Sequence, residues 1–159
     1  MIILAIDPGN IESGYAVIEM PDFRLMEFGK VENEKLKEML KNKWLIDDIA
    51  VEMVGCYGMP VGKDVFDTCV WIGRFVEAIG KEVTYIYRKD EKITLCNSMK
   101  AKDSNVKQAL VNRYAKHDFR SGKGTQKNPD TFYGVANDVW QAIAVGVTYY
   151  EIEQEKQRE

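Results

Sequence analysis

The chain has 159 residues, of which 45% are hydrophobic and 11% aromatic, and its formal net charge is −3. This composition excludes a disordered chain and is typical of a globular protein with one core. We expect a single domain over residues 1–159, with no membrane span, since no apolar stretch is long enough, and no signal peptide, since Met1 leads directly into a strand. Three scattered cysteines are too few for a disulfide framework and predict a reducing, cytoplasmic location.

The first half of the chain predicts four strands and a helix. The continuous apolar run 2–6 indicates a central strand that is buried on both faces. Strands at 15–20 and 23–31 follow, joined across Pro21 and Asp22 as a hairpin. A charged segment, 32–43, with apolar residues on one side predicts a surface helix, and 47–53 predicts another buried strand.

The second half predicts helices around one more strand. Residues 55–64 form a loop rich in glycine, 65–79 a helix, and 82–87 a strand. Ser104 is expected to be the N-cap of a further helix. A basic loop over 117–134 then leads to a last helix from Val135 to about Glu155. This order predicts an α/β fold with a mixed sheet, its first strands joined by hairpins and its later ones by helices.

Positive charge is concentrated in one segment. Residues 88–127 hold eleven Lys or Arg and four Asp or Glu, a local charge of +7 that leaves −10 for the rest of the chain. A charge run is usually a solvated face, but a segment this unequal in an acidic protein indicates a site for a polyanion.

Three carboxylates lie at the ends of predicted elements. Asp7 ends the first strand, Glu52 lies near the end of the fourth, and Asp138 lies in the first turn of the last helix. If the first and fourth strands are parallel neighbours, Asp7 and Glu52 project from adjacent carboxyl ends, where open α/β sheets place their sites. Taken singly, each acid has an ordinary structural explanation as a turn acceptor, an exposed strand end or a charge at a helix start.

A converging group of three acids would repel unless cations held it together. Oxygen ligands without His or Cys select Mg²⁺ or Mn²⁺. A pair of such ions suits phosphoryl chemistry, in which one activates a water and the other stabilises the leaving oxygen. Together with the basic segment, this chemistry points to a phosphodiester of nucleic acid as the substrate.

The stretches AIDPG…SGYAV, AVE and AND…AIA, in this order and spacing, resemble the RuvC family of Holliday junction resolvases within the ribonuclease H-like superfamily. The resemblance implies a single ribonuclease H-like domain with a five-stranded mixed sheet flanked by helices. It implies a homodimeric, Mg²⁺-dependent endonuclease that nicks opposing strands of four-way DNA junctions, with Mn²⁺ able to substitute. The short chain suggests a phage-encoded member, which would act in the cytoplasm of a bacterial host.

The resemblance also implies roles for particular residues. Asp7, Glu52 and Asp138 match the metal-binding acids of the family. The family uses lysines near the scissile phosphate, for which Lys92 and Lys102 are the best matches, with Lys100 as an alternative to Lys102. The side chains that we expect to contact DNA are Tyr57, Lys63, Lys89, Lys100, Lys107, Arg120, Lys123 and Lys127.

Two departures from the family pattern stand out. The family carries a fourth ligand, Asp or His, three residues before the aspartate of the last helix, and here that position is Val135. Asn137 or Asp130 could supply the ligand instead, or it could be absent. Many relatives also carry an aromatic residue directly after the strand-ending Glu, whereas the first aromatic here is Tyr57, which could stack on a base or pack within its loop. We expect the helix 65–79 to form the dimer interface.

Two other readings compete with a nuclease. The pattern from Asp7 to Gly14 also resembles the phosphate loop of sugar kinases and actin-like ATPases, but those need two such domains and 159 residues have room for one. A junction-binding protein without catalysis, on the same fold, is the alternative that Val135 favours. A purely structural module accounts for neither the three acids nor the basic segment.

Overall fold

The computed structural model describes residues 1–42 and 45–159, and within them five strands form one sheet in the order β3-β2-β1-β4-β5. β1 is antiparallel to β2, and β2 to β3, whereas β1 is parallel to β4 and β4 to β5. The predicted mixed sheet is therefore confirmed, as is the parallel pairing of the first and fourth strands. The strands are β1 (Ile2–Asp7), β2 (Glu12–Glu19), β3 (Arg24–Glu32), β4 (Asp48–Met53) and β5 (Thr84–Tyr87).

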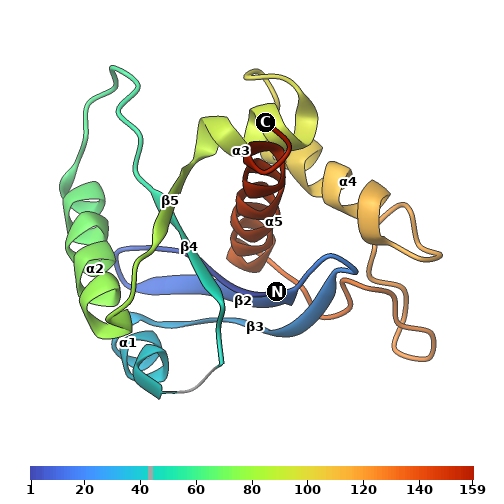
Figure 1. Ribbon diagram of the computed structural model, residues 1–159, viewed down its shortest axis with the longest axis horizontal. Helices are drawn as coiled ribbons and strands as arrows, with labels where there is room; N and C mark the ends of the chain where they lie inside the picture. The colour runs from blue at the N-terminus through green and yellow to red at the C-terminus, as the bar shows by residue number, and fades with distance from the viewer. Residues whose placement is uncertain (43–44) are drawn as a thin grey trace.

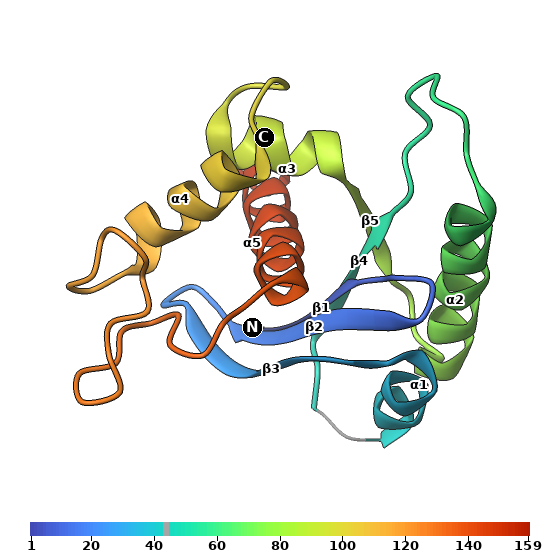
Figure 2. The same ribbon diagram turned by 180° about the vertical axis from the view of Figure 1, so that it is seen from behind.

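Helices cover both faces of the sheet (Figure 1). α1 and α2 pack against one face, and α5 packs against the other, with α3 and α4 beside it (Figure 2). No helix of the described residues is long and apolar enough to cross a membrane. The helices of this part of the chain are α1 (Asn33–Asn42), α2 (Lys63–Ile79), α3 (Arg88–Cys96), α4 (Asp103–Tyr114) and α5 (Asp138–Lys156).

The side chains of β1 alternate between two apolar clusters. Leu4 and Ile6 belong to the cluster that contains α1 and α2, whereas Ile3 and Ala5 belong to the cluster that contains α5. Covering both faces explains the unbroken apolar run, because the four residues from Ile3 to Ile6 are all buried. The same alternation places Asp7 on the α5 face of the sheet.

α5 lies unusually close to the sheet. Its residues from Val139 to Tyr149 are buried except for the partly buried Gln141. A Cβ added at Gly146 would lie 2.8 Å from the Ile18 Cδ1 and 3.0 Å from the Ala5 Cβ, so a larger side chain there would crowd β1 and β2. The depth at which α5 packs also fixes the position of its first turn.

One helix was not predicted, and several element boundaries differ from the sequence predictions. α3 was not expected, because its polar segment buries only Glu91 and Leu95; the Asp90 side chain starts it by accepting the Tyr87 N–H at 3.0 Å. The prediction of Ser104 as N-cap was wrong: α4 begins at Asp103, and Lys102 occupies the cap position.

The last helix begins at Asp138, three residues later than predicted, because Asn137 has a φ of 49° and interrupts the helical geometry. The predicted end of the first helix, at Lys43, lies outside the described residues.

Packing at Gly146 gives a stability prediction. Gly146→Val should lower the free energy of unfolding by about 1–3 kcal/mol, because the added methyl groups overpack the contact between α5 and β1. Gly73→Ala is the matched control on α2: a Cβ there meets nothing within 4 Å, and we expect a gain of about 0.5–1 kcal/mol from helix propensity. Urea unfolding followed by circular dichroism measures both, and an unchanged midpoint for Gly146→Val would contradict the packing.

Candidate active site

Asp7 and Glu52 are brought together by strand register. In the parallel pair of β1 and β4, Ala5 lies opposite Ala50 and Ile6 opposite Val51, so the next pair along the ladder is Asp7 and Glu52. Asp7 and Glu52 each come two residues after an alanine, Ala5 or Ala50, that faces α5, so their side chains extend from the same face. The two carboxylates therefore extend from neighbouring carboxyl ends on the same face, as the sequence predicts.

Asp138 joins them because a glycine leaves room for the start of α5. Gly14 is the partner of Asp7 across the antiparallel ladder of β1 and β2. A Cβ at Gly14 would lie 2.7 Å from the backbone oxygen of Asp138, so no other residue permits this approach. Asp7 and Asp138 consequently line one cleft, with a volume of about 340 Å³.

The turn that follows Asp7 is held by buried polar side chains. The Gly9 N–H donates to the Ser13 hydroxyl at 3.0 Å, and that hydroxyl donates to the Asn33 side-chain oxygen at 2.6 Å. The Asn33 amide in turn donates to the Gly9 carbonyl at 2.8 Å. A Cβ at Gly9 would lie 2.2 Å from the Glu12 carbonyl oxygen. This closed ring of hydrogen bonds makes a compact, rigid turn beside the carboxylates.

Charge repulsion and burial dominate the electrostatics of the site. Burial, then the charge of Glu52 and a hydrogen bond between the two carboxyl groups, and then the charge of Asp138 raise the pKa of Asp7 to about 9. The Oε2 of Glu52 is buried and accepts no hydrogen bond from an N–H group or a hydroxyl. A cation would relieve the repulsion between the two carboxyl groups.

Asp138 has a partner that the sequence does not reveal. Lys30, on β3, forms an ion pair with Asp138 at 2.7 Å, and the hydrogen bond and charge of Asp138 raise the pKa of Lys30. Both side chains are partly exposed. Among residues 1–42 and 45–159, no three His, Cys, Asp or Glu side chains are gathered closely enough to hold a metal ion. Metal binding by all three acids thus requires Asp138 to turn from Lys30 toward Asp7.

The donor set fits a hard divalent cation. Asp7, Glu52 and Asp138 offer only oxygen atoms, the ligands that Mg²⁺ and Mn²⁺ prefer. The Glu52 oxygen without an N–H or hydroxyl donor and the raised pKa of Asp7 both mark a site that a cation would stabilise. The structure therefore pairs two of the three acids, Asp7 and Glu52, and leaves Asp138 beside them on Lys30, from which it would have to turn to complete a metal site.

The candidates for a fourth ligand separate clearly. Val135 is fully buried in the core and precedes α5. Both oxygens of Asp130 accept hydrogen bonds from backbone N–H groups in and next to the basic loop, including those of Lys116 and Asp118. These hydrogen bonds hold the Asp130 side chain within the loop. Asn137 lines the same cleft as Asp7 and Asp138. Of these two residues, only Asn137 lies on the cleft, and the absence of a fourth ligand stays the other alternative.

Sequence analysis missed a guanidinium within the acidic site. Arg88 lines the cleft with Asp7 and Asp138, and its Nε lies 3.5 Å from the Glu52 Oε1. A signal was available, because Arg88 directly follows β5, the parallel neighbour of β4. In that ladder Ala50 pairs with Thr84 and Glu52 with Ile86. Arg88 comes two residues after Ile86, so it follows on the same face of the sheet as Glu52.

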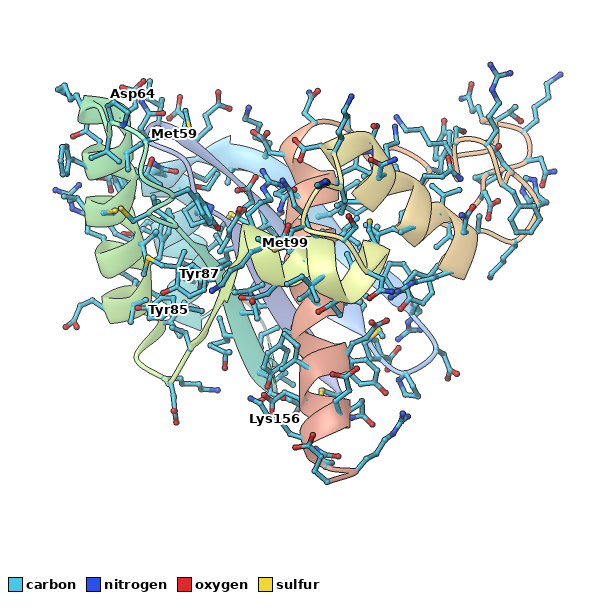
Figure 3. The ribbon with its side chains drawn as sticks, turned by 90° about the horizontal axis from the view of Figure 1, so that it is seen from above. Met59, Asp64, Tyr85, Tyr87, Met99 and Lys156 are labelled. Atoms are coloured by element: carbon cyan, nitrogen blue, oxygen red, sulfur yellow. The ribbon has the colours of Figure 1, made fainter. Side chains whose placement is uncertain are left out.

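The predicted lysine Lys92 lies next to this site. A hollow of about 200 Å³ is lined by Tyr57, Arg88, Lys89, Lys92 and Met99. Figure 3 shows Tyr87 and Met99 beside α3, with Met59 of the neighbouring loop on the side toward α2. Tyr57 is exposed, and its ring lies over Gly55 of the same loop, where an added Cβ would be 2.5 Å from the Tyr57 Cζ, so both alternatives for this residue stay open. This hollow brings together three of the residues that we expect to contact the substrate.

Other predicted contacts lie further along the surface. Lys107 lines the acidic cleft, with its Nζ 4.8 Å from the centre of the Trp140 ring. Lys63 begins α2 and forms an ion pair with Asp67 at 2.6 Å. Lys100 and Lys102 are exposed between α3 and α4.

Arg120, Lys123 and Lys127 belong to the basic loop between α4 and α5, at the end of the molecule away from α2 in all three views (Figures 1–3). Asp118 and Asp130 brace this loop. Hydrogen bonds from Ser121 and from the Gly124 and Arg120 backbone hold the pKa of Asp118 well below its usual range. The loop is thus an ordered basic surface, and the structure does not bring it together with Tyr57 and Lys63.

Comparisons with known proteins give the fold. No family model and no curated protein matches the chain. The structure of RuvC from Thermus thermophilus matches with a TM-score of 0.72 at 16% identity, covering 98% of this chain and 97% of the other. T. thermophilus RuvC in complex with a Holliday junction substrate matches with a TM-score of 0.72 at 15% identity, covering 98% and 96%.

The Fowlpox virus resolvase in complex with substrate Holliday junction DNA matches with a TM-score of 0.52 at 14% identity, covering 96% of this chain and 98% of the other. The chain therefore has the fold of RuvC along nearly its whole length, and the predicted ribonuclease H-like architecture is confirmed.

The raised pKa of Asp7 predicts how pH affects stability without metal. Asp7 titrates near 9 in the folded state but near 3.9 in an unfolded chain. Between these values the folded state holds a proton that the unfolded state has lost, so raising the pH lowers the free energy of unfolding. In EDTA, we expect a slope of at most about 1.4 kcal/mol per pH unit for each such group.

Thermal unfolding at pH 5–9 measures this slope. Burial and then the charge of Glu52 also raise the pKa of Glu91 to about 9, so two groups contribute. Asp7→Asn should make the melting temperature less sensitive to pH, whereas Asp22→Asn, at an exposed position, should leave the slope unchanged. An Asp7→Asn variant with the full slope would contradict the assignment.

Proposed function

We propose that the chain is a metal-dependent endonuclease that resolves Holliday junctions and other branched DNA, with residues 1–159 acting as one nuclease domain. The observation that carries the proposal is the pairing of Asp7 and Glu52 at the edge of the sheet, with Asp138 on the same cleft as Asp7, next to basic residues of α3 and α4. The matched structures support it, since two of them are complexes with Holliday junction substrates. If the chain is phage-encoded, its place of action is the cytoplasm of the bacterial host.

In this mechanism the three carboxylates hold Mg²⁺ or Mn²⁺, whose chemistry in phosphodiester hydrolysis is to activate a water and to stabilise the leaving oxygen. The rigid turn after Asp7 leaves the carboxylates open to an approaching backbone. Lys92 and Lys102 stabilise negative charge that develops on the phosphate. Asp7, whose pKa is raised to about 9, would have to lose its proton to solvent in order to serve as a ligand.

DNA binding is assigned to the surface on either side of the acids. Tyr57 and Lys89 lie on one side with Lys92, and the basic loop lies on the other side. Tyr57 is free to stack on an unpaired base at the branch point. Lys63, Lys100, Lys107, Arg120, Lys123 and Lys127 supply phosphate contacts along this surface.

A homodimer accounts for paired nicks. Two sites related by a two-fold axis face two strands of a four-way junction without any further coupling device. We assign the interface to α2, which exposes Phe66 and Val70 on the face of the molecule away from α5. Large apolar side chains exposed on one helix are typical of a protein contact.

The competing function is a junction-binding protein that has lost catalysis. The core position of Val135 favours it, because the family places a ligand there. The Glu52 oxygen without an N–H or hydroxyl donor and the arrangement of all three acids favour the nuclease, since a binding protein has no use for carboxylates that face phosphate.

Asp7→Asn separates the two functions. In Mg²⁺, we expect the wild type to make paired nicks in a labelled four-way junction, to leave a linear duplex of the same sequence intact, and to lose activity in EDTA. Asp7→Asn should lower cleavage by about 10³-fold or more, as loss of a central catalytic group does. Junction affinity should persist or tighten, because a negative charge that faces phosphate is removed.

The control for this experiment is Asp64→Asn, at an exposed position on α2. Normal nicking by Asp7→Asn would contradict the metal site. Junction binding without cleavage by the wild type, in both Mg²⁺ and Mn²⁺, would favour the binding protein.

The basic loop predicts a strong dependence of binding on salt. Junction affinity should fall steeply between 50 and 200 mM salt, as expected for proteins that make several phosphate contacts. Lys123→Ala and Lys127→Ala should each reduce the slope of log affinity against log salt by about 1. Lys156→Ala, at the far end of α5, should not change it. Fluorescence anisotropy measures the slope, and an affinity insensitive to salt would show that this loop is not the contact surface.

A further inference from the structure

Arg88 contacts acids from three different elements. Its Nε lies 3.5 Å from the Glu52 Oε1 on β4, and its Nη1 lies 3.5 Å from the Asp103 Oδ1 on α4. The same Nη1 lies 3.7 Å from the Glu91 Oε2 within α3. The ion pairs with these acids are long for hydrogen bonds, so they attract the guanidinium without using up its donors.

The side chains of Glu91, which is buried, and Gln141, which is partly buried, fix the orientation of Arg88. Its Nη1 donates to the Gln141 side-chain oxygen, and the Gln141 amide donates to the Glu91 Oε2. The Glu91 side chain is completely buried, and its other oxygen, Oε1, has no partner. Gln141 lies one turn after Asp138 on α5, so the element that carries a proposed metal ligand also positions the arginine.

Arg88 is also open to a ligand on two sides. One third of its side chain, 33%, is exposed. It lines the cleft that contains Asp7 and Asp138, and it lines the hollow that contains Tyr57 and Lys92. It is thus the cation that connects the acids with the surface assigned to DNA.

We propose, on the basis of the nuclease function proposed above, that Arg88 binds the phosphate that is cleaved and that Glu91 and Gln141 position it for this contact. A guanidinium presents a planar fork of N–H groups that matches two phosphate oxygens, which a lysine ammonium does not. Its neighbours leave donors available. A cation held by Glu52 would weaken the attraction of that carboxylate for Arg88, and the N–H groups of the positioned guanidinium that face Glu52 would be available to phosphate.

The test compares Arg88→Gln and Arg88→Lys with wild type. Arg113→Gln is the matched control: Arg113 on α4 has a side chain 30% exposed, pairs with Glu151, and does not line the acidic cleft. Single-turnover cleavage of a four-way junction gives the rate. Anisotropy in Ca²⁺ gives junction affinity, and titration with Mn²⁺ followed by electron paramagnetic resonance gives metal affinity without DNA.

Arg88→Gln should lower the single-turnover rate about 100-fold, as loss of a transition-state donor does. It should reduce the salt slope of junction binding by about 1, as loss of one phosphate contact does. Mn²⁺ affinity should stay the same or increase, since a cation beside the acids is removed. Arg88→Lys should bind DNA as tightly as wild type but cleave as slowly as Arg88→Gln, because lysine keeps the positive charge but lacks the paired N–H groups of the guanidinium. Arg113→Gln should match wild type in all three measurements.

A neutral linkage identifies the contact directly. Replacing the mapped scissile phosphate by a methylphosphonate should weaken wild-type binding in Ca²⁺ about 10-fold and should weaken Arg88→Gln no further, because the contact is already lost. A purely structural role would leave the variant as sensitive as wild type. That result, or loss of Mn²⁺ binding by Arg88→Gln, would overturn the proposal.

Failure of the nuclease function remains distinguishable from failure of this proposal. If wild type binds junctions without cleaving them, the methylphosphonate is scanned across the branch point instead. The proposal for Arg88 is then supported if a methylphosphonate at one position weakens junction binding by wild type but not by Arg88→Gln. It is contradicted if no position has this effect.

Discussion

The register of two parallel strands places the carboxyl groups of Asp7 and Glu52 side by side, and much of the surrounding structure serves to make that arrangement tolerable. Two buried acids in contact repel one another, and both lose hydration. Three features reduce this repulsion. The raised pKa of Asp7 keeps its carboxyl group neutral, the Arg88 guanidinium lies 3.5 Å from Glu52, and Lys30 forms an ion pair with Asp138. One Glu52 oxygen accepts no hydrogen bond from an N–H group or a hydroxyl. The site is therefore balanced without metal but contains groups that a divalent cation would bind.

Small residues allow this balance. Gly14 admits the first turn of α5 beside Asp7, and Gly146 lets the same helix lie close to Ala5 and Ile18. Because both contacts act on one helix, the position of Asp138 is set by core packing and not by a flexible loop. This is the type of support that a catalytic constellation requires, since its geometry has to be held by elements that do not move.

Much of this could be predicted from the sequence, because the signals were local and periodic. The apolar runs that end at Asp7 and Glu52 indicated buried strands, and a parallel pairing of the two was enough to expect the acids at one edge. α3 was missed because a helix that buries mainly one charged residue, Glu91, has no apolar period to detect. Arg88 and Lys30 were missed because their roles depend on contacts between distant elements. The choice between Asn137 and Asp130 also needed the structure, which shows Asp130 bonded to backbone amides.

Anomalous diffraction from crystals grown with Mn²⁺ would locate the metal ligands directly. We expect Mn²⁺ bound by Asp7 and Glu52, with Asp138 turned from Lys30 to complete the site and Arg88 facing the open side. A well-ordered site with no anomalous peak between Asp7 and Glu52, and with Asp138 still paired to Lys30 at saturating Mn²⁺, would contradict this expectation. The three acids would then be structural, and the protein would bind junctions without cutting them.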